Sequence, residues 1–337
     1  MNDNNIQGKI ITRIGDTLVD SNDDICKAVL LYDTKKICVF KREESIEVIN
    51  VNNDDEDYSV DTPVRQGNVC YKTYPHCRLC CGCADYEHVD GSEKLEFQNV
   101  GVSSFEKEFC VSYGTVVGVY YECGTNRYEE YTNIDKQDWF IVGVCYIAKD
   151  LIALCDDDSN NIIIYDSALS SEKGRINYKA NEIVPLIKQE DKTLLCALDN
   201  TNNKCAFCNY SDYTVSTIIQ FDETIIAGYE LPQSDDLIAF IGNNSIYIVS
   251  LNTFQIVDTI YASNNSIKEC GIVPNSDTIC LLLDDNSICF VNCDTQDITD
   301  LVIDNNEDDQ TITNIIAVDD NNLVIIKNDN TINVIEY

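Results

Sequence analysis

Residues 236–251 read DLIAFIGNNSIYIVSL, which is an apolar run, a tight turn rich in Asn and Gly, and a second apolar run. Four further segments share this form, namely DLIALCDDDSNNIIIYD (150–166), TLLCALDNTNNKCAFCNY (193–210), TICLLLDDNSICFVNC (278–293) and NLVIIKNDNTINVIEY (322–337). The first aliphatic residues of the five segments are Leu151, Leu194, Leu237, Ile279 and Leu323, so the steps are 43, 43, 42 and 44 residues. The segments are therefore an internal repeat with a period in the low forties.

Each repeat unit is expected to contain four short strands. One strand precedes the first apolar run, as in VGVCYIA (142–148), and a fourth follows the second run, as in TVSTIIQF (214–221). β-Branched and aromatic residues dominate these stretches, as strands prefer. The Asp, Asn and Gly clusters between them suit hairpin turns that need positive φ. A period in the low forties with only strand-like segments predicts an all-β fold made of propeller blades.

The repeat extends toward the N-terminus with less regular spacing. Further anchors are assigned to Ile37, Leu79 and Val116, and the steps 37→79, 79→116 and 116→151 are 42, 37 and 35 residues. We therefore expect distorted, Cys-rich blades over residues 65–135 and regular blades over 140–337. Counting every anchor favours eight four-stranded antiparallel blades, with seven as the alternative. All of residues 1–337 are expected to form one closed β-propeller domain.

The last unit offers only three strand-like segments, the third of which ends at Tyr337. The strand-like segment at residues 8–15 has no unit of its own. We expect this N-terminal strand to act as a clasp and to become the fourth strand of the last blade. Such a clasp would close the ring and remove two unpaired sheet edges.

On these turn-plus-strand units the chain resembles the degenerate members of the WD-repeat β-propeller family, with no subfamily assigned. The segment DDDSNNIIIYD ends at Asp166, where the family often ends in Trp-Asp. The family's Gly-His pair is absent, and the single tryptophan, Trp139, precedes phenylalanine. The resemblance implies a rigid platform for protein–protein interaction that is a subunit of a larger assembly. It also implies that acidic members can shield basic clients.

The charge of the chain narrows its partners. The 58 acidic residues against 23 Lys and Arg give a formal net charge of −35, which repels nucleic acid and anionic lipid. We therefore expect no direct nucleic-acid or membrane binding and favour basic protein partners in a hetero-complex. The acidic runs at 54–57, 156–158 and 307–309 are read either as solvated loops or as an acidic rim that captures a basic partner.

The cysteines and the N-terminal residues bear on localisation. The start, MNDNNIQGK, has neither a basic n-region nor an apolar h-region, so we expect a cytoplasmic or nuclear protein that is not secreted. Most of the 18 cysteines stand where Val or Ala would serve, as at Cys38, Cys155, Cys280 and Cys289. They are predicted to be reduced, buried thiols that pack like small apolar side chains.

One segment carries candidate metal chemistry. Cys77, Cys80, Cys83 and His88 have the local spacing of a zinc site, and thiolate and imidazole are ligands that zinc favours. The alternative is plain thiols, because a regular strand points Cys80 and Cys81 to opposite faces.

No phosphate loop, nucleophile elbow or HExxH motif is found. We therefore predict no catalytic residues, no cofactor and no enzymatic activity. The alternatives are a propeller hydrolase or lactonase with a metal in its channel, or a purely structural subunit.

Overall fold

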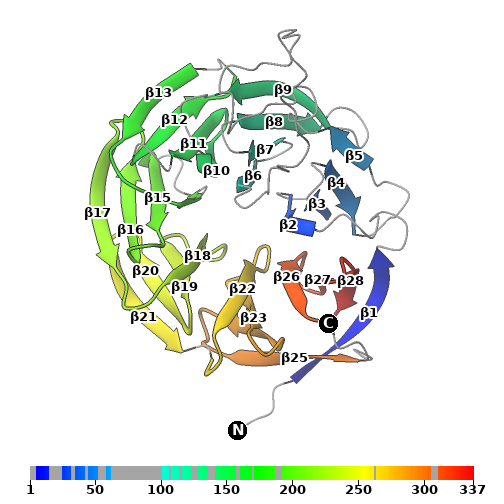
Figure 1. Ribbon diagram of the computed structural model, residues 1–337. Coiled ribbons are helices and arrows are strands. Elements are labelled where there is room, and N and C mark those ends of the chain that lie inside the picture. The colour runs from blue at the N-terminus through cyan, green and yellow to red at the C-terminus, as the bar shows by residue number, and fades with distance from the viewer. Residues whose placement is uncertain are drawn as a thin grey trace. The chain divides into compact units, whose positions relative to one another are not determined.

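The computed structural model consists of β-strands and their connections, with no helix among the residues that it describes (Figure 1). The described residues are 5–14, 25–31, 35–41, 45–51, 58–61, 101–105, 108–113, 116–122, 128–135, 141–156, 160–168, 171–186, 188, 192–261, 263–304 and 310–337. The chain groups into two compact units, unit 1 (Met1–Asp24, Val184–Cys208 and Ser216–Tyr337) and unit 2 (Ile25–Ile183 and Asn209–Val215). Whether all residues form one closed domain stays a prediction.

The strands of unit 2 form three four-stranded sheets, each in the order of the chain. The first sheet holds β2 (Ile25–Leu30), β3 (Lys36–Lys41), β4 (Ser45–Asn50) and β5 (Tyr58–Asp61). The second holds β6 (Gly101–Phe105), β7 (Glu108–Tyr113), β8 (Val116–Glu122) and β9 (Tyr128–Asp135). The third holds β10 (Ile141–Ala148), β11 (Leu151–Asp156), β12 (Asn161–Asp166) and β13 (Ser171–Ile176).

The later strands repeat the same pattern of four. One sheet holds β14 (Glu182–Val184), β15 (Leu194–Asp199), β16 (Lys204–Asn209) and β17 (Thr214–Gln220), and the next holds β18 (Ile225–Glu230), β19 (Leu237–Gly242), β20 (Ser245–Ser250) and β21 (Gln255–Tyr261). Two further groups are β22 (Ile267–Ile272), β23 (Thr278–Leu283), β24 (Ile288–Asn292) and β25 (Ile298–Asp304), and β26 (Ile312–Ala317), β27 (Asn322–Lys327) and β28 (Ile332–Glu336). The predicted all-β blades of four short strands are confirmed.

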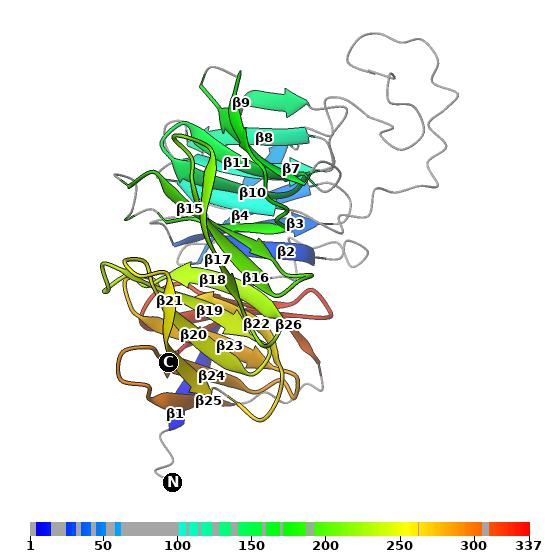
Figure 2. The same ribbon diagram turned by 90° about the vertical axis from the view of Figure 1, so that its left-hand side faces the viewer.

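The N-terminal strand β1 (Asn5–Ile14) completes the last group. It pairs antiparallel with β28, with Lys9 opposite Glu336 and Ile14 opposite Ile332. The predicted strand at residues 8–15 thus forms, begins earlier and takes the expected place. β1 also pairs in parallel with β25, where Ile6 lies opposite Leu301, so β22–β25 and β26–β28 join through β1 into one eight-stranded sheet. Figure 2 shows β1 alongside β25.

The assignment of Val116 as an anchor is wrong in register. The other described anchors begin, or directly follow the start of, the second strand of a blade, whereas Val116 begins the third strand, β8. The second strand of that blade is β7, which begins at Glu108, 43 residues before Leu151. The apparent short step of 35 residues therefore disappears. The described residues hold seven four-stranded groups once β1 is counted, and the unit anchored at Leu79 lies outside them.

The middle strands of the blades formed from β10 onward are buried on both faces. Along β19, Ile238 and Phe240 pack in one apolar cluster, while Ala239 and Ile241 pack in another. This arrangement explains why the repeat shows continuous apolar runs rather than a strict alternation of apolar and polar residues. The eleven cysteines whose side chains the structure describes are free and buried, including Cys38, Cys155, Cys280 and Cys289, as expected.

Candidate interaction surfaces

Most residues proposed from sequence as site residues lie outside the described part of the chain. Cys77, Cys80, Cys83 and His88 are all in this group, as are the acidic runs at 54–57 and 307–309. Of the acidic run at 156–158 only Asp156 is described, and it is buried at the end of β11, opposite Asn161. Within the described residues, no three His, Cys, Asp or Glu side chains are grouped so that they could hold a metal ion.

Acidic side chains in the described hairpins have a structural role in the turns. Asp285, between β23 and β24, accepts hydrogen bonds at Oδ1 from the backbone N–H (3.0 Å) and the hydroxyl (2.5 Å) of Ser287. Its other oxygen accepts a bond of 2.6 Å from the Asn265 side-chain amide. The hydrogen bond from the Ser287 hydroxyl has the largest effect on the pKa of the Asp285 carboxyl, followed by that from the Ser287 backbone N–H. Both lower the pKa of Asp285, so the carboxyl stays ionised. Asp285 is exposed, so this turn shows negative charge to solvent.

The same turn chemistry recurs along the chain. Asp212 accepts hydrogen bonds from the backbone N–H and the hydroxyl of Thr214, and Asp329 accepts one from the backbone N–H of Thr331. Asn286 and Asn330 follow Asp285 and Asp329 and adopt positive φ, which Asn tolerates better than most residues. The abundance of Asp and Asn is therefore explained in part by hairpin geometry, and exposed carboxylates are its by-product.

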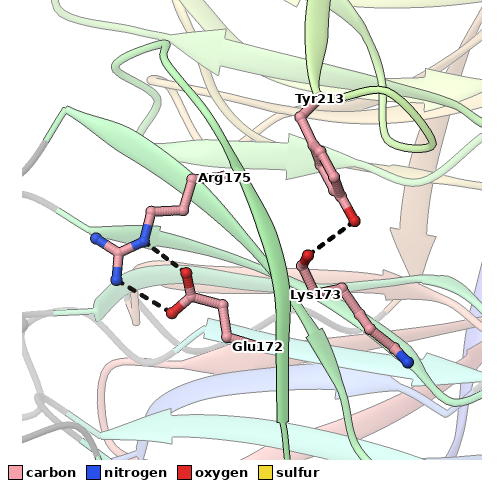
Figure 3. Close-up of polar contacts among 4 residues, drawn as sticks. All are labelled: Glu172, Lys173, Arg175 and Tyr213. Atoms are coloured by element: carbon pink, nitrogen blue, oxygen red, sulfur yellow. Dashed lines mark hydrogen bonds and ion pairs between the residues drawn. The ribbon is translucent and has the colours of Figure 1, made fainter.

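The last strands of the blades differ in how their outer edges are protected. Charged residues line β13, where the guanidinium of Arg175 donates from Nε and Nη2 to the two carboxylate oxygens of Glu172 at 2.7 and 3.1 Å (Figure 3). Lys173 Nζ lies 3.1 Å from Asp166 Oδ2. Charged side chains on an edge strand oppose the addition of another strand.

Tyr213 provides a second form of protection for β13. Its hydroxyl donates to the backbone carbonyl of Lys173 at 2.9 Å, as Figure 3 shows. The ring lies so close to Gly174 that no side chain would fit beneath it. Tyr213 sits in the turn between β16 and β17 and adopts positive φ. One exposed carbonyl of the β13 edge is therefore already paired.

Apolar side chains of unit 1 are exposed on the last strands of three other blades. They are Ile218 on β17, Ile256, Val257 and Tyr261 on β21, and Ile298 and Val302 on β25. On β21 every residue except Ile260 is exposed. β25 pairs with β1, whereas β17 and β21 are terminal strands of their sheets. Edge strands that expose apolar side chains are common sites of pairing with another chain. The sequence pattern does not reveal this surface, because an apolar residue in the fourth strand of a blade cannot be told from a buried core residue by its type alone.

Four of the described thiols are unsuited to a reactive centre. Burial raises the pKa of Cys145 to about 12, and it also raises the pKa values of Cys208, Cys289 and Cys293 to about 12. Since the thiolate is the nucleophile and the metal ligand, these side chains are protonated and inert at neutral pH. No described helix is long and apolar enough to cross a membrane.

Comparison of the structure with solved proteins identifies the fold. The WD40 β-propeller domain of Doa1 matches 98% of this chain and 96% of its own chain, with a TM-score of 0.64 and 9% sequence identity. Raptor from Chaetomium thermophilum matches 99% of this chain with a TM-score of 0.67 and 9% identity, over 29% of its own length. No family profile and no curated protein matches the sequence. The chain thus has the fold of a WD40-like β-propeller, as the resemblance implied.

Proposed function

We propose that this WD40-like β-propeller is a non-enzymatic protein–protein interaction scaffold, a subunit of a larger assembly whose acidic surface binds basic protein partners. The net charge of −35 on a rigid blade architecture is the observation that carries the proposal. Exposed carboxylates in the described turns, such as Asp212 and Asp285, are held in place by hydrogen bonds. Fixed negative charges raise the association rate of basic partners and select against acidic ones.

The proposed scaffold has no catalytic group and no cofactor. Both histidines of the chain, His76 and His88, stand in the segment that also carries the zinc candidates. Because this segment lies outside the described residues, zinc binding there stays a prediction. The thiols of Cys145 and Cys289 are shielded from reaction, because burial raises their pKa values to about 12 and holds them in the protonated form. We propose a cytoplasmic or nuclear location, where an acidic scaffold meets basic proteins.

Binding of basic peptides by the full chain, measured as a function of salt, tests the proposal. The probe is a blocked eight-residue peptide of alternating Lys and Val, and the control peptide has Glu in place of each Lys. We expect the Lys peptide to bind and its affinity to fall at least about tenfold between about 50 and 500 mM NaCl, because salt screens charge–charge attraction. Binding that does not depend on salt, or equal binding of the Glu peptide, would contradict the proposal. Pull-down with identification of the captured proteins would then name the partner.

A further inference from the structure

The outer edge of β21 combines two features that suit the binding of another strand. β21 is the terminal strand of the sheet β18–β21, so its outer edge has no strand partner among the described residues. Val257 and Tyr261 are 55% and 60% exposed, and Ile256 is 39% exposed. β17 also has no outer strand partner among the described residues, but Ile218 is the one large apolar side chain that it exposes. An edge with several exposed apolar residues is a template for β-strand addition, in which the main chain supplies hydrogen bonds and side chains supply specificity.

The equivalent edge of the following blade is already filled by a strand, and that strand indicates what such an edge accepts. β1 adds to β25 in parallel from Asn5 to Lys9. Ile6 and Ile10 of β1 pack against the apolar cluster that includes Leu301. In register, Lys9 lies opposite Asp304 on one side and Glu336 on the other. The strand accepted by this edge thus combines β-branched apolar residues with a basic residue among acidic ones.

We propose that the outer edge of β21 binds an extended partner segment in which β-branched apolar residues alternate with Lys or Arg. The inference rests on the proposed function and names one place where a basic partner docks. Asp258 on β21 is exposed, and the Gln296 side-chain amide donates to its Oδ2 at 2.6 Å, which fixes the carboxylate. Asp297 and Asp300 are exposed beside Gln296 and on β25. A basic segment complements these charges, whereas a second copy of a chain carrying −35 is repelled.

The contrast with β13 supports the choice of β21. On β13 the edge carries Glu172, Lys173 and Arg175, and the Tyr213 hydroxyl already occupies the Lys173 carbonyl. Three of the six residues of β13 are exposed, as are all residues of β21 except Ile260. Asp258 is the one ionisable carboxylate or cation among the exposed residues of β21. β13 therefore has the features that natural sheets use to prevent strand addition, and β21 lacks most of them.

Aspartate substitution separates edge docking from simple charge attraction. In the double variant Val257→Asp/Tyr261→Asp two exposed apolar contacts are lost while the protein becomes more acidic. We expect the alternating Lys–Val peptide to bind this variant about tenfold or more weakly than it binds the wild type, because cross-strand apolar pairs are removed. The control, Ile218→Asp on β17, adds one exposed negative charge where the double variant adds two, and it should bind the peptide at least as well as the wild type.

Two further measurements test the inference even if the Asp variants do not fold. Val257→Thr/Tyr261→Thr keeps high β-propensity and adds no charge, so it should fold and should also weaken binding. In the wild-type complex, the amides of residues 255–261 should gain protection from hydrogen exchange, and N-methylation of alternate peptide amides should abolish that gain.

The outcomes distinguish the two proposals. If a blocked peptide with four Lys followed by four Val binds as well as the alternating peptide, or the Asp double variant binds as tightly as the wild type, the edge inference is wrong and the acidic scaffold stands. If neither peptide binds the wild type in a salt-dependent way, both proposals fail. Dimerisation of the free protein that Val257→Asp/Tyr261→Asp abolishes would assign the edge to a second copy and overturn the inference.

Discussion

Replacing Gly174 by alanine should destabilise the protein through its contact with Tyr213. A Cβ atom built on Gly174 would overlap Cζ of the Tyr213 ring and lie 2.5 and 2.6 Å from Cε1 and Cε2. Real Cβ atoms do not come this close, so the ring must swing away and its hydroxyl must leave the Lys173 carbonyl. Overpacking of this kind costs about 1–3 kcal/mol, and a half-buried ring that can move toward solvent should fall at the lower end, near 1–2 kcal/mol. This cost includes the lost hydrogen bond, which is worth about 0.5–1.5 kcal/mol.

The sign of the effect should reverse when Tyr213 is absent. Gly174 does not adopt positive φ, so alanine fits the backbone there and stabilises by about 0.4–1 kcal/mol through the unfolded chain. Gly174→Ala should therefore lower the free energy of unfolding by about 1 kcal/mol in the wild type and raise it by about 0.5 kcal/mol in Tyr213→Ala. Urea unfolding followed by far-UV circular dichroism on the four proteins measures this cycle. Equal effects of Gly174→Ala in both backgrounds would refute the assigned packing of Tyr213 on β13.

The clasp and the thiols yield two more predictions. Deleting residues 1–14 should lower the melting temperature by about 5 °C or more, because it exposes the edges of β25 and β28 and uncovers Leu301 and Ile335. An unchanged melting temperature would show that β1 does not stabilise the blade. The pKa of Cys145 is about 12 in the folded protein, above that of a thiol in an unfolded chain. The protonated Cys145 thiol therefore contributes its full stabilisation of the folded state below about pH 8.5, and this contribution is lost as pH rises toward 12. The unfolding free energy should fall from pH 8 to pH 10, with a smaller fall in Cys145→Ala, and identical slopes in the two proteins would contradict the burial of this thiol.

The regular repeat units could be predicted almost strand by strand. Anchors such as Leu194, Leu237 and Leu323 begin or nearly begin the second strand of a blade, because a strand buried on both faces needs an uninterrupted apolar run. The assignment failed at Val116, where β7 and β8 are both rich in apolar residues and the true second strand begins with Glu108. In β7 the residues Phe109 and Cys110 follow Glu108, so the first aliphatic residue is Val111 and a search for aliphatic anchors passes over the start of the strand.

The candidate surfaces were less predictable than the strands. The acidic turns could be read from sequence, since Asp and Asn form the side-chain–backbone hydrogen bonds of hairpins, as Asp285 does with Ser287. The open edge of β21 could not, because Ile256 and Val257 have the composition of a buried strand. The same holds for Tyr213, whose contact with Gly174 joins residues about 40 positions apart.

By itself the sequence determined the strand content, the period of about 42 residues and a charge of −35 that favours basic partners. Only the tertiary structure decided that β1 pairs with β25 as well as β28, that Tyr213 packs on β13, and that β21 has no outer strand partner among the described residues. The physical reason is that turns and strands follow from neighbouring residues, whose preferences are local. The occupancy of a sheet edge depends on which distant strand reaches it, and no local pattern records that pairing.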